Sequence, residues 1–268
     1  MSTLVFFHAH PDDECIGSGG SIALAADAGH RVVLVVATRG EHGSVVPGML
    51  PEGNQLGILR IGEAMKAAEV LGIDRVEFLG YVDSGMMGES TNDDPYAFWR
   101  ADVDSAGRRL AAILVEEQAD VLVTYDPDGN YGHPDHIQVH RVGYRAAEFA
   151  QTPVVYEMTM NRDAMLEAMT ARRATATPEE LEAFPEIDPA TFTMGTPEAE
   201  ITHCIDVTAL TERKRAAMRC HRSQISDDDF FLKLSDEDFT MAFGHEWYID
   251  RSRPRAEGAA FLTSLLDD

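Results

Sequence analysis

Short apolar runs alternate with segments of helical periodicity along the first part of the chain. The runs are rich in valine and end at polar or turn-forming residues, which is typical of buried strands. They predict strands over 4–8, 31–38, 76–79, 121–125 and 154–158. Helical spacing between them predicts helices over 18–28, 56–71, 98–118 and 133–149, and Gly29 and Gly72 are suited to end the first two. Strands that alternate with helices of this length indicate a mostly parallel sheet with helices on both faces.

The pattern changes after this α/β core. Residues 159–200 are rich in Ala, Thr, Glu and Pro and have weak periodicity, so we expect a helical excursion or lid near the site. A strand is predicted over 201–207, a helix over 210–220 and a short apolar segment over 246–249. We therefore predict an α/β protein with a Rossmann-like metal-binding core in 1–158. Residues 159–268 are expected to add the lid segment and a C-terminal strand and helix to the same domain.

Charge and composition limit the classes of binding partner that we expect. The chain has 22 Lys and Arg against 46 Asp and Glu, a formal net charge of −24. Such a surface repels phosphate backbones and anionic lipids, so we expect neither a nucleic acid nor a membrane partner. The N-terminus lacks the pattern of a signal peptide and the three cysteines are widely spaced, which favours a cytoplasmic location. The sequence leaves open whether the chain forms a homo-oligomer.

The motif AHPDDE, residues 9–14, directly follows the first predicted strand. Adjacent acids repel one another, and a nearby cation relieves that repulsion. His10 and Asp13 offer one nitrogen and one oxygen, both suited to zinc, and Asp12 between them can face a metal-bound water. The alternative is a polar turn that caps the next helix, since Asp and Pro are common turn residues.

A second HPD turn lies in TYDPDGNYGHPDH, residues 124–136, after another predicted strand. Ligands of parallel sheets bind beyond the carboxyl ends of the strands, so the two turns are expected to meet there. His133 and His136 can share a helix face, one binding the metal and the other reaching the substrate. Two histidines and one carboxylate leave a zinc coordination position open for water, which is typical of catalytic sites. Fe²⁺ and Co²⁺ accept the same donors.

This donor set predicts a hydrolase. Zinc lowers the pKa of a bound water to about 7. A carboxylate base can then take the proton of that water, and the oxygen attacks a carbonyl carbon. A histidine next to the developing oxyanion can stabilise it or protonate the leaving amine.

The pair AHPDDE and GHPDH resembles the signature of the PIG-L/LmbE-like family of zinc-dependent N-deacetylases. Residues 37–43, 60–73, 81–86 and 214–224 are also similar to that family. Within it, the chain most resembles the actinobacterial mycothiol-pathway branch. That branch contains a deacetylase of N-acetylglucosaminyl-inositol and an amidase of mycothiol S-conjugates.

The resemblance implies a role for each motif residue. The implied zinc ligands are His10, Asp13 and His136. The implied catalytic residues are Asp12 as general base, His133 at the tetrahedral intermediate and leaving group, and Tyr131 as a mobile tyrosine that polarises the carbonyl.

Three further residues lie where family members hold sugar or cyclitol hydroxyls, namely Arg60, Asp83 and Glu41. On the residues alone, Arg60 could instead pair with a surface acid, and Asp83 or Glu41 could cap a turn. For His221 and Gln224, packing is the default expectation.

The expected substrate is small, polar, N-acylated and sugar-like. Conjugate amidases of this branch commonly have a lysine two residues after HPDDE, whereas this chain has Ile16. That difference favours a deacetylase over an amidase of mycothiol S-conjugates or of a natural product. Segment 85–98 could line the pocket and change the acyl or sugar preference. A sugar-binding protein without turnover is disfavoured because Asp12 and His133 are both present.

Overall fold

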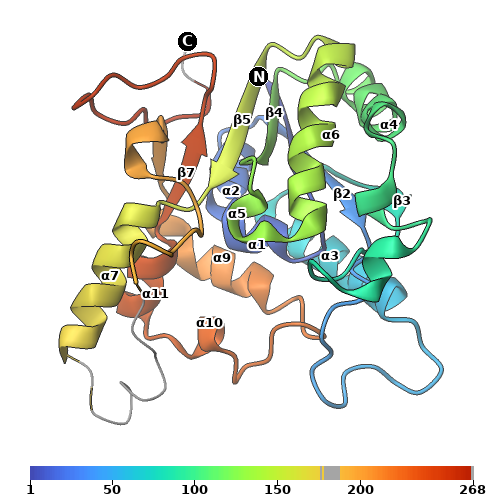
Figure 1. Ribbon diagram of the computed structural model, residues 1–268, viewed down its shortest axis with the longest axis horizontal. Coiled ribbons are helices and arrows are strands. Elements are labelled where there is room, and N and C mark those ends of the chain that lie inside the picture. Colours follow the sequence, from blue (N-terminus) through green and yellow to red (C-terminus); the bar gives the residue numbers. More distant parts are fainter. Residues whose placement is uncertain (176, 178–187, 267–268) are drawn as a thin grey trace.

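The computed structural model describes residues 1–175, 177 and 188–266 (Figure 1). Within them, one sheet of seven strands has the order β3-β2-β1-β4-β5-β7-β6. The strands are β1 (Thr3–His8), β2 (Arg31–Thr38), β3 (Arg75–Tyr81), β4 (Val121–Tyr125), β5 (Val154–Thr159), β6 (His203–Asp206) and β7 (His245–Ile249).

The pairing confirms a mostly parallel sheet. Strands β1 to β5 pair in parallel, whereas β7 is antiparallel to both β5 and β6. Strand β1 lies between β2 and β4, and its residues from Leu4 to His8 are buried. This explains why the strand reads as a continuous apolar run rather than an alternating one.

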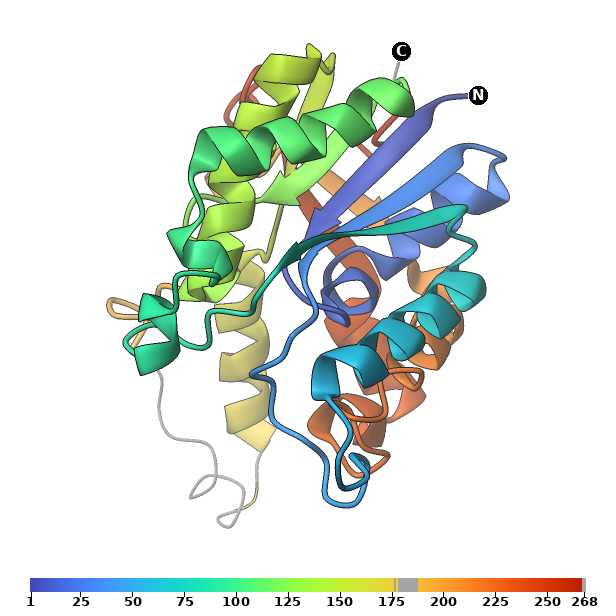
Figure 2. The ribbon, with the colours of Figure 1, turned by 90° about the vertical axis from the view of Figure 1, so that its right-hand side faces the viewer.

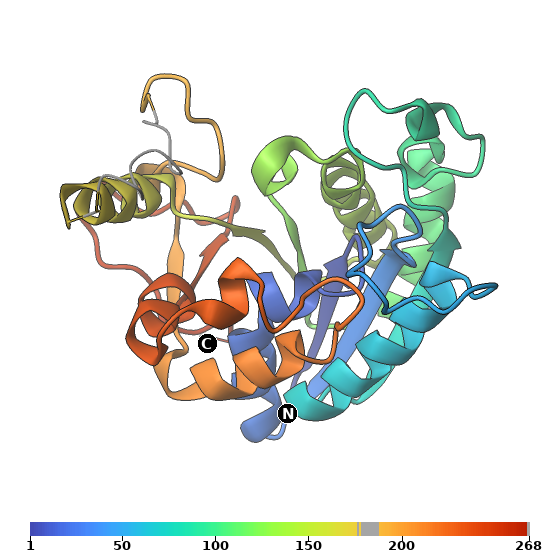
Figure 3. The same ribbon diagram turned by 90° about the horizontal axis from the view of Figure 1, so that it is seen from below.

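Helices cover both faces of the sheet, as predicted (Figures 2 and 3). One face carries α2 (Gly19–Asp27), α3 (Leu56–Leu71) and α9 (Thr211–Met218), and the other carries α4 (Val103–Glu116) and α6 (Pro134–Ala150). The remaining α-helices of the described residues are α1 (Asp13–Gly17), α5 (Gly129–Gly132), α7 (Arg162–Thr175), α10 (Phe230–Lys233) and α11 (Asp236–Phe243).

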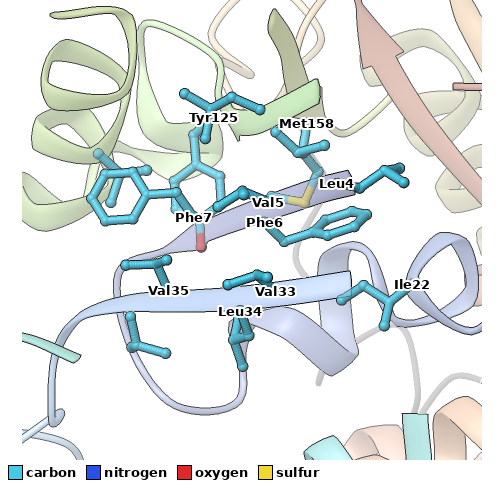
Figure 4. Close-up of a cluster of buried hydrophobic side chains, with 14 of the residues drawn as sticks. Leu4, Val5, Phe6, Phe7, Ile22, Val33, Leu34, Val35, Tyr125 and Met158 are labelled. Carbon is cyan, nitrogen blue, oxygen red and sulfur yellow. The ribbon is translucent and has the colours of Figure 1, made fainter. Parts of the chain in front are cut away.

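The core lies where the central strands meet these helices (Figure 4). Phe6 and Val33 are fully buried, and so is Ile22 of α2. Burial of one such side chain contributes about 1.5–3 kcal/mol. These contacts stabilise the strands whose ends carry the site.

The helix predicted over 98–118 begins later than expected. Residues Phe98–Arg100 form a separate 3-10 turn, and α4 starts at Val103. The side chain of Asp102 accepts a hydrogen bond from the backbone N–H of Ser105, which caps the helix. Apolar spacing extended the prediction across this cap because periodicity alone does not identify a cap.

The region predicted as a helical excursion or lid contains α7, and its role as a lid stays a prediction. Residues 176 and 178–187 lie outside the described residues. Beyond them, the backbone N–H of Gly195 donates to the carbonyl of Asn130, 2.7 Å away, in the turn before α6. In the part of the chain that the structure describes, no helix is long and apolar enough to cross a membrane.

Candidate metal centre and active site

The two HPD turns begin at the ends of neighbouring strands. Strand β1 ends at His8 and β4 ends at Tyr125, and the edge where both end is the one seen in Figure 3. The Tyr125 hydroxyl lies 2.7 Å from Nδ1 of His8, and both side chains are buried. This contact holds the two strand ends together and brings the turns side by side.

The turn before α6 needs glycine. Gly129 has φ of 60°, and a Cβ there would lie 2.5 Å from Cβ of His136. Helix α6 then begins with His133 as its N-cap, because Nδ1 of His133 accepts from the N–H of Asp135 at 3.1 Å. Pro134 follows at the first helical position, where its missing N–H costs nothing. The GHPDH motif therefore places His136 in the first turn of the helix.

The predicted ligands His10, Asp13 and His136 converge. Oδ2 of Asp13 lies 3.5 Å from Nδ1 of His10 and 3.5 Å from Nε2 of His136. Two ligands each about 2.0–2.1 Å from a zinc ion in tetrahedral geometry are about 3.4 Å apart. The donor types of the three residues and the two separations from Asp13 therefore fit a zinc ion.

His133 lies close enough to compete with Asp13 as the third ligand. Ligand atoms of His10, His133 and His136 lie within 4.8 Å of one another. Because Nδ1 of His133 is occupied by the N–H of Asp135, Nε2 is the nitrogen that His133 can offer. Both sets share His10 and His136, and Asp13 as the third ligand stays a prediction.

Asp135 organises the site, and no role was predicted for it. Its fully buried carboxylate accepts from the Ser84 N–H at 2.9 Å and from the Ser84 hydroxyl. Nε2 of His10 lies 3.2 Å from the same carboxylate and 3.5 Å from Asp83. This arrangement leaves Nδ1 of His10 facing Asp13. Carboxylates that accept from the other ring nitrogen commonly orient metal-binding histidines in this way. The sequence signal that could have indicated a role for Asp135 is its place as the Asp of the second HPD turn.

These carboxylates also set the charge of His10. Burial alone would lower the pKa of its imidazole. Hydrogen bonds to Asp13, Asp135 and Asp83 outweigh burial and raise this pKa well above its usual value. The site therefore stabilises positive charge at this point.

Asp12, the predicted base, has a carboxyl whose pKa is shifted. Burial raises the pKa of its carboxyl to about 6, the positive charge of Arg60 opposes the rise, and Asp13 adds to it. Nη2 of Arg60 donates to Oδ2 of Asp12 at 3.0 Å. A carboxylate with this pKa is ionised at neutral pH and still accepts a proton readily.

Arg60 is buried and contacts Asp12 rather than a surface acid. It also donates to the carbonyls of Gly40, at 2.9 Å, and Pro11. Gly40 has φ of 65°, and a Cβ there would lie 2.1 Å from Nη1 of Arg60. The predicted contact of Arg60 with a sugar hydroxyl stays a prediction.

Asp83 and Glu41 hold the loops at the same edge. Asp83 accepts from the N–H of His42 at 3.1 Å and that of Gly85 at 2.8 Å. Glu41 accepts from the N–H of Asp83 at 3.1 Å and from Arg39 at 2.8 Å. Their predicted role at substrate hydroxyls stays untested.

Tyr131 and His133 flank the donor set. The Tyr131 side chain is 45% exposed, and its hydroxyl lies 3.3 Å from Nε2 of His136. Burial and the nearby charge of His10 lower the pKa of His133. Since Nδ1 of His133 accepts a backbone hydrogen bond, the neutral ring carries its proton on Nε2.

Comparison with known proteins identifies the family of the chain. The family model described as PIG-L, GlcNAc-PI de-N-acetylase, matches residues 5–147. A 1D-myo-inositol 2-acetamido-2-deoxy-alpha-D-glucopyranoside deacetylase of Acidothermus cellulolyticus is 41% identical over 260 residues, covering 93% of this chain and 88% of that protein.

Two solved structures share the fold. An N,N'-diacetylchitobiose deacetylase from Pyrococcus horikoshii has a TM-score of 0.54 at 24% identity, covering 85% of this chain and 72% of that chain. A 4-carboxy-2-hydroxymuconate hydratase from Pseudomonas putida has a TM-score of 0.59 at 22% identity, covering 97% and 100%. Because a hydratase has the same fold, the fold by itself does not determine the reaction. The family match over more than half of the chain and the relative at 41% identity do settle its membership: the chain belongs to the PIG-L family of de-N-acetylases and is an amide hydrolase.

Proposed function

We propose that the chain is a zinc-dependent N-deacetylase of a 2-acetamido sugar linked to inositol. The supporting observation is the convergence of the donors of His10, Asp13 and His136, with Asp12 immediately before Asp13 in the chain. The name of the Acidothermus cellulolyticus relative specifies an acetamido sugar on inositol, and we extend that substrate class to this chain.

The proposed reaction uses the residues as follows. Zinc held by His10, Asp13 and His136 would acidify a water molecule and polarise the amide carbonyl. Asp12 takes a proton from the water, whose oxygen bonds to the carbonyl carbon. The C–N bond then breaks, and Asp12 returns the proton to the leaving nitrogen. The products are acetate and a free amino sugar.

His133 and Tyr131 stabilise charge in this scheme. The proton on Nε2 of neutral His133 is available for donation to the developing oxyanion. Nε2 of His136 has one lone pair, so a metal and the Tyr131 hydroxyl compete for it. When the metal binds His136, the Tyr131 hydroxyl is free to donate to the substrate carbonyl.

Ile16 supports a deacetylase rather than a conjugate amidase. Its side chain is partly buried and packs against the hydrophobic core. Position 16 therefore offers no cation to a larger, charged conjugate.

The test compares three substrates with zinc-loaded enzyme. We expect acetate release from N-acetylglucosaminyl-inositol, slower release from N-acetylglucosamine, and little cleavage of a mycothiol S-conjugate. Asp12→Asn should keep one zinc per chain and lose turnover. Preferred cleavage of the conjugate would support the amidase instead, and no cleavage of any acetamido sugar would refute the proposal.

A further inference from the structure

Asp12 is joined to a buried acid–imidazole pair to which the proposed reaction gives no role. Oε2 of Glu14 accepts from the backbone N–H of Asp12 at 2.9 Å. Oε1 of Glu14 lies 2.7 Å from Nε2 of His221, which follows α9 and is 207 positions away in the sequence. Glu14 and His221 are both 0% exposed. A carboxylate and an imidazole buried this completely need a partner or a function, and here each is the partner of the other.

The backbone of Asp12 is unusual at this point. Its φ is 117° and its ψ is −29°, a region that residues with a side chain rarely adopt. Such a conformation persists when the surrounding structure holds it, and it is concentrated at functional sites. Asp12 is also the N-cap of α1, but its side chain makes no capping hydrogen bond. The carboxylate is therefore left to face Arg60 instead of its own helix.

Both polar groups of the Pro11–Asp12 peptide are held by buried side chains. Arg60 donates to the carbonyl of Pro11, and Glu14 accepts from the N–H of Asp12. Arg60 also donates to the carboxylate of Asp12. One cation and one anion thus fix the orientation of a single peptide, and with it the direction in which the base points.

We propose that Glu14, held in place by His221, is a positioning residue that keeps Asp12 in its strained, catalytically useful conformation. This inference rests on the proposed function because it requires Asp12 to be the base. It gives Glu14 of AHPDDE a role separate from metal binding. It also explains why His221, in the segment 214–224, is buried against the first turn of α1.

A second metal site is the competing explanation for this cluster. Ligand atoms of Glu14, Cys15 and His221 lie within 4.8 Å of one another. However, both oxygens of Glu14 already have hydrogen-bond partners, and Sγ of Cys15 donates to the carbonyl of Asp12 at 3.0 Å. Nδ1 of His221 has no hydrogen-bond partner, but both Glu14 oxygens, Nε2 of His221 and Sγ of Cys15 already have one, so positioning is favoured over metal binding.

Matched pairs of variants test the inference in the zinc-loaded enzyme. Glu14→Met removes the acceptor for the Asp12 N–H, whereas Glu14→Gln keeps a carbonyl oxygen there at similar volume. His221→Leu removes the donor to Glu14, whereas His221→Gln can still donate. We expect Glu14→Met and His221→Leu to lower kcat by about 10- to 100-fold, as loss of supporting residues commonly does. KM and one zinc per chain should be unchanged, and the two glutamine variants should restore most of kcat.

Several results would overturn the inference. One is a folded Glu14→Met enzyme with unchanged kcat. Another is a variant that loses zinc and shows a raised KM together with a lowered kcat. A third is a second equivalent of zinc bound by the wild type that Glu14→Met abolishes. A crystal structure of Glu14→Met tests the inference independently of activity: we expect Asp12 to leave its positive φ, and a value that stays near 117° would contradict us. In contrast, a wild type without deacetylase activity, or an active Asp12→Asn variant, would refute the proposed function.

Discussion

Replacement of Asp135 by asparagine isolates the effect of one buried charge on the metal site. The asparagine oxygen can still accept from Nε2 of His10 and from the N–H of Ser84, and its amide can donate to the Ser84 hydroxyl. The shape and the hydrogen bonds can thus be retained while the negative charge next to His10 is lost. We expect zinc to bind more weakly because His10 becomes a poorer donor.

The size of the effect follows from the type of hydrogen bond. A hydrogen bond to a charged group contributes about 1.5–3 kcal/mol, against about 0.5–1.5 kcal/mol for a neutral one. The difference of about 1–1.5 kcal/mol corresponds to a roughly 5- to 12-fold weaker affinity. Competition for zinc with a chromophoric chelator measures this directly, and excess zinc should restore most of the turnover.

Asp128→Asn is the matched control. Asp128 lies in the same turn and is exposed, and its side chain makes no capping hydrogen bond. The control removes the same charge without touching His10, so zinc affinity should hardly change. If Asp135→Asn binds zinc as tightly as wild type, the orienting role of Asp135 is wrong.

Three further predictions concern the base, the tyrosine and the fold. Because Asp12 must be ionised to accept a proton and burial raises its pKa to about 6, kcat/KM should fall as the pH drops through that value or slightly below it with zinc bound. Arg60→Gln should move this acid limb to higher pH, and a pH–rate profile that lacks the shift would contradict the assignment. Tyr131→Phe should leave the melting temperature unchanged, because Tyr131 is 45% exposed. It should lower kcat by about 100-fold, because one oxyanion donor is lost; an unchanged kcat would remove Tyr131 from the mechanism. Lys214→Met leaves the buried carboxylate of Glu246, 2.6 Å from the lysine in the wild type, without a cation. Urea unfolding should therefore show a free energy of unfolding lower by about 3–5 kcal/mol. A decrease below about 1 kcal/mol would show that the ion pair is dispensable.

The sequence predicted correctly the bounds of those elements whose ends are set by nearby residues. The bounds of β2, α3 and β4 agree with the predicted ranges 31–38, 56–71 and 121–125. Each of these elements is a continuous apolar run or has a clear helical period, and Gly72 with φ of 84° ends α3. The start of α4 was misplaced because it depends on the Asp102 cap, which periodicity does not detect.

The site was predictable where parallel-sheet geometry alone brings residues together. His10 and His136 follow two strands that pair directly, so the carboxyl-end rule was enough to bring them close. Asp135, Glu14 and His221 act through the direction of their side chains. Glu14 contacts a residue 207 positions away, and no local pattern encodes such a contact.

The central claim is most directly tested by anomalous diffraction at the zinc edge from crystals that contain one equivalent of zinc. We expect a single peak about 2.0–2.2 Å from Nδ1 of His10, Oδ2 of Asp13 and Nε2 of His136. A peak coordinated by His133 in place of Asp13, a peak elsewhere in the protein, or no peak would contradict the account.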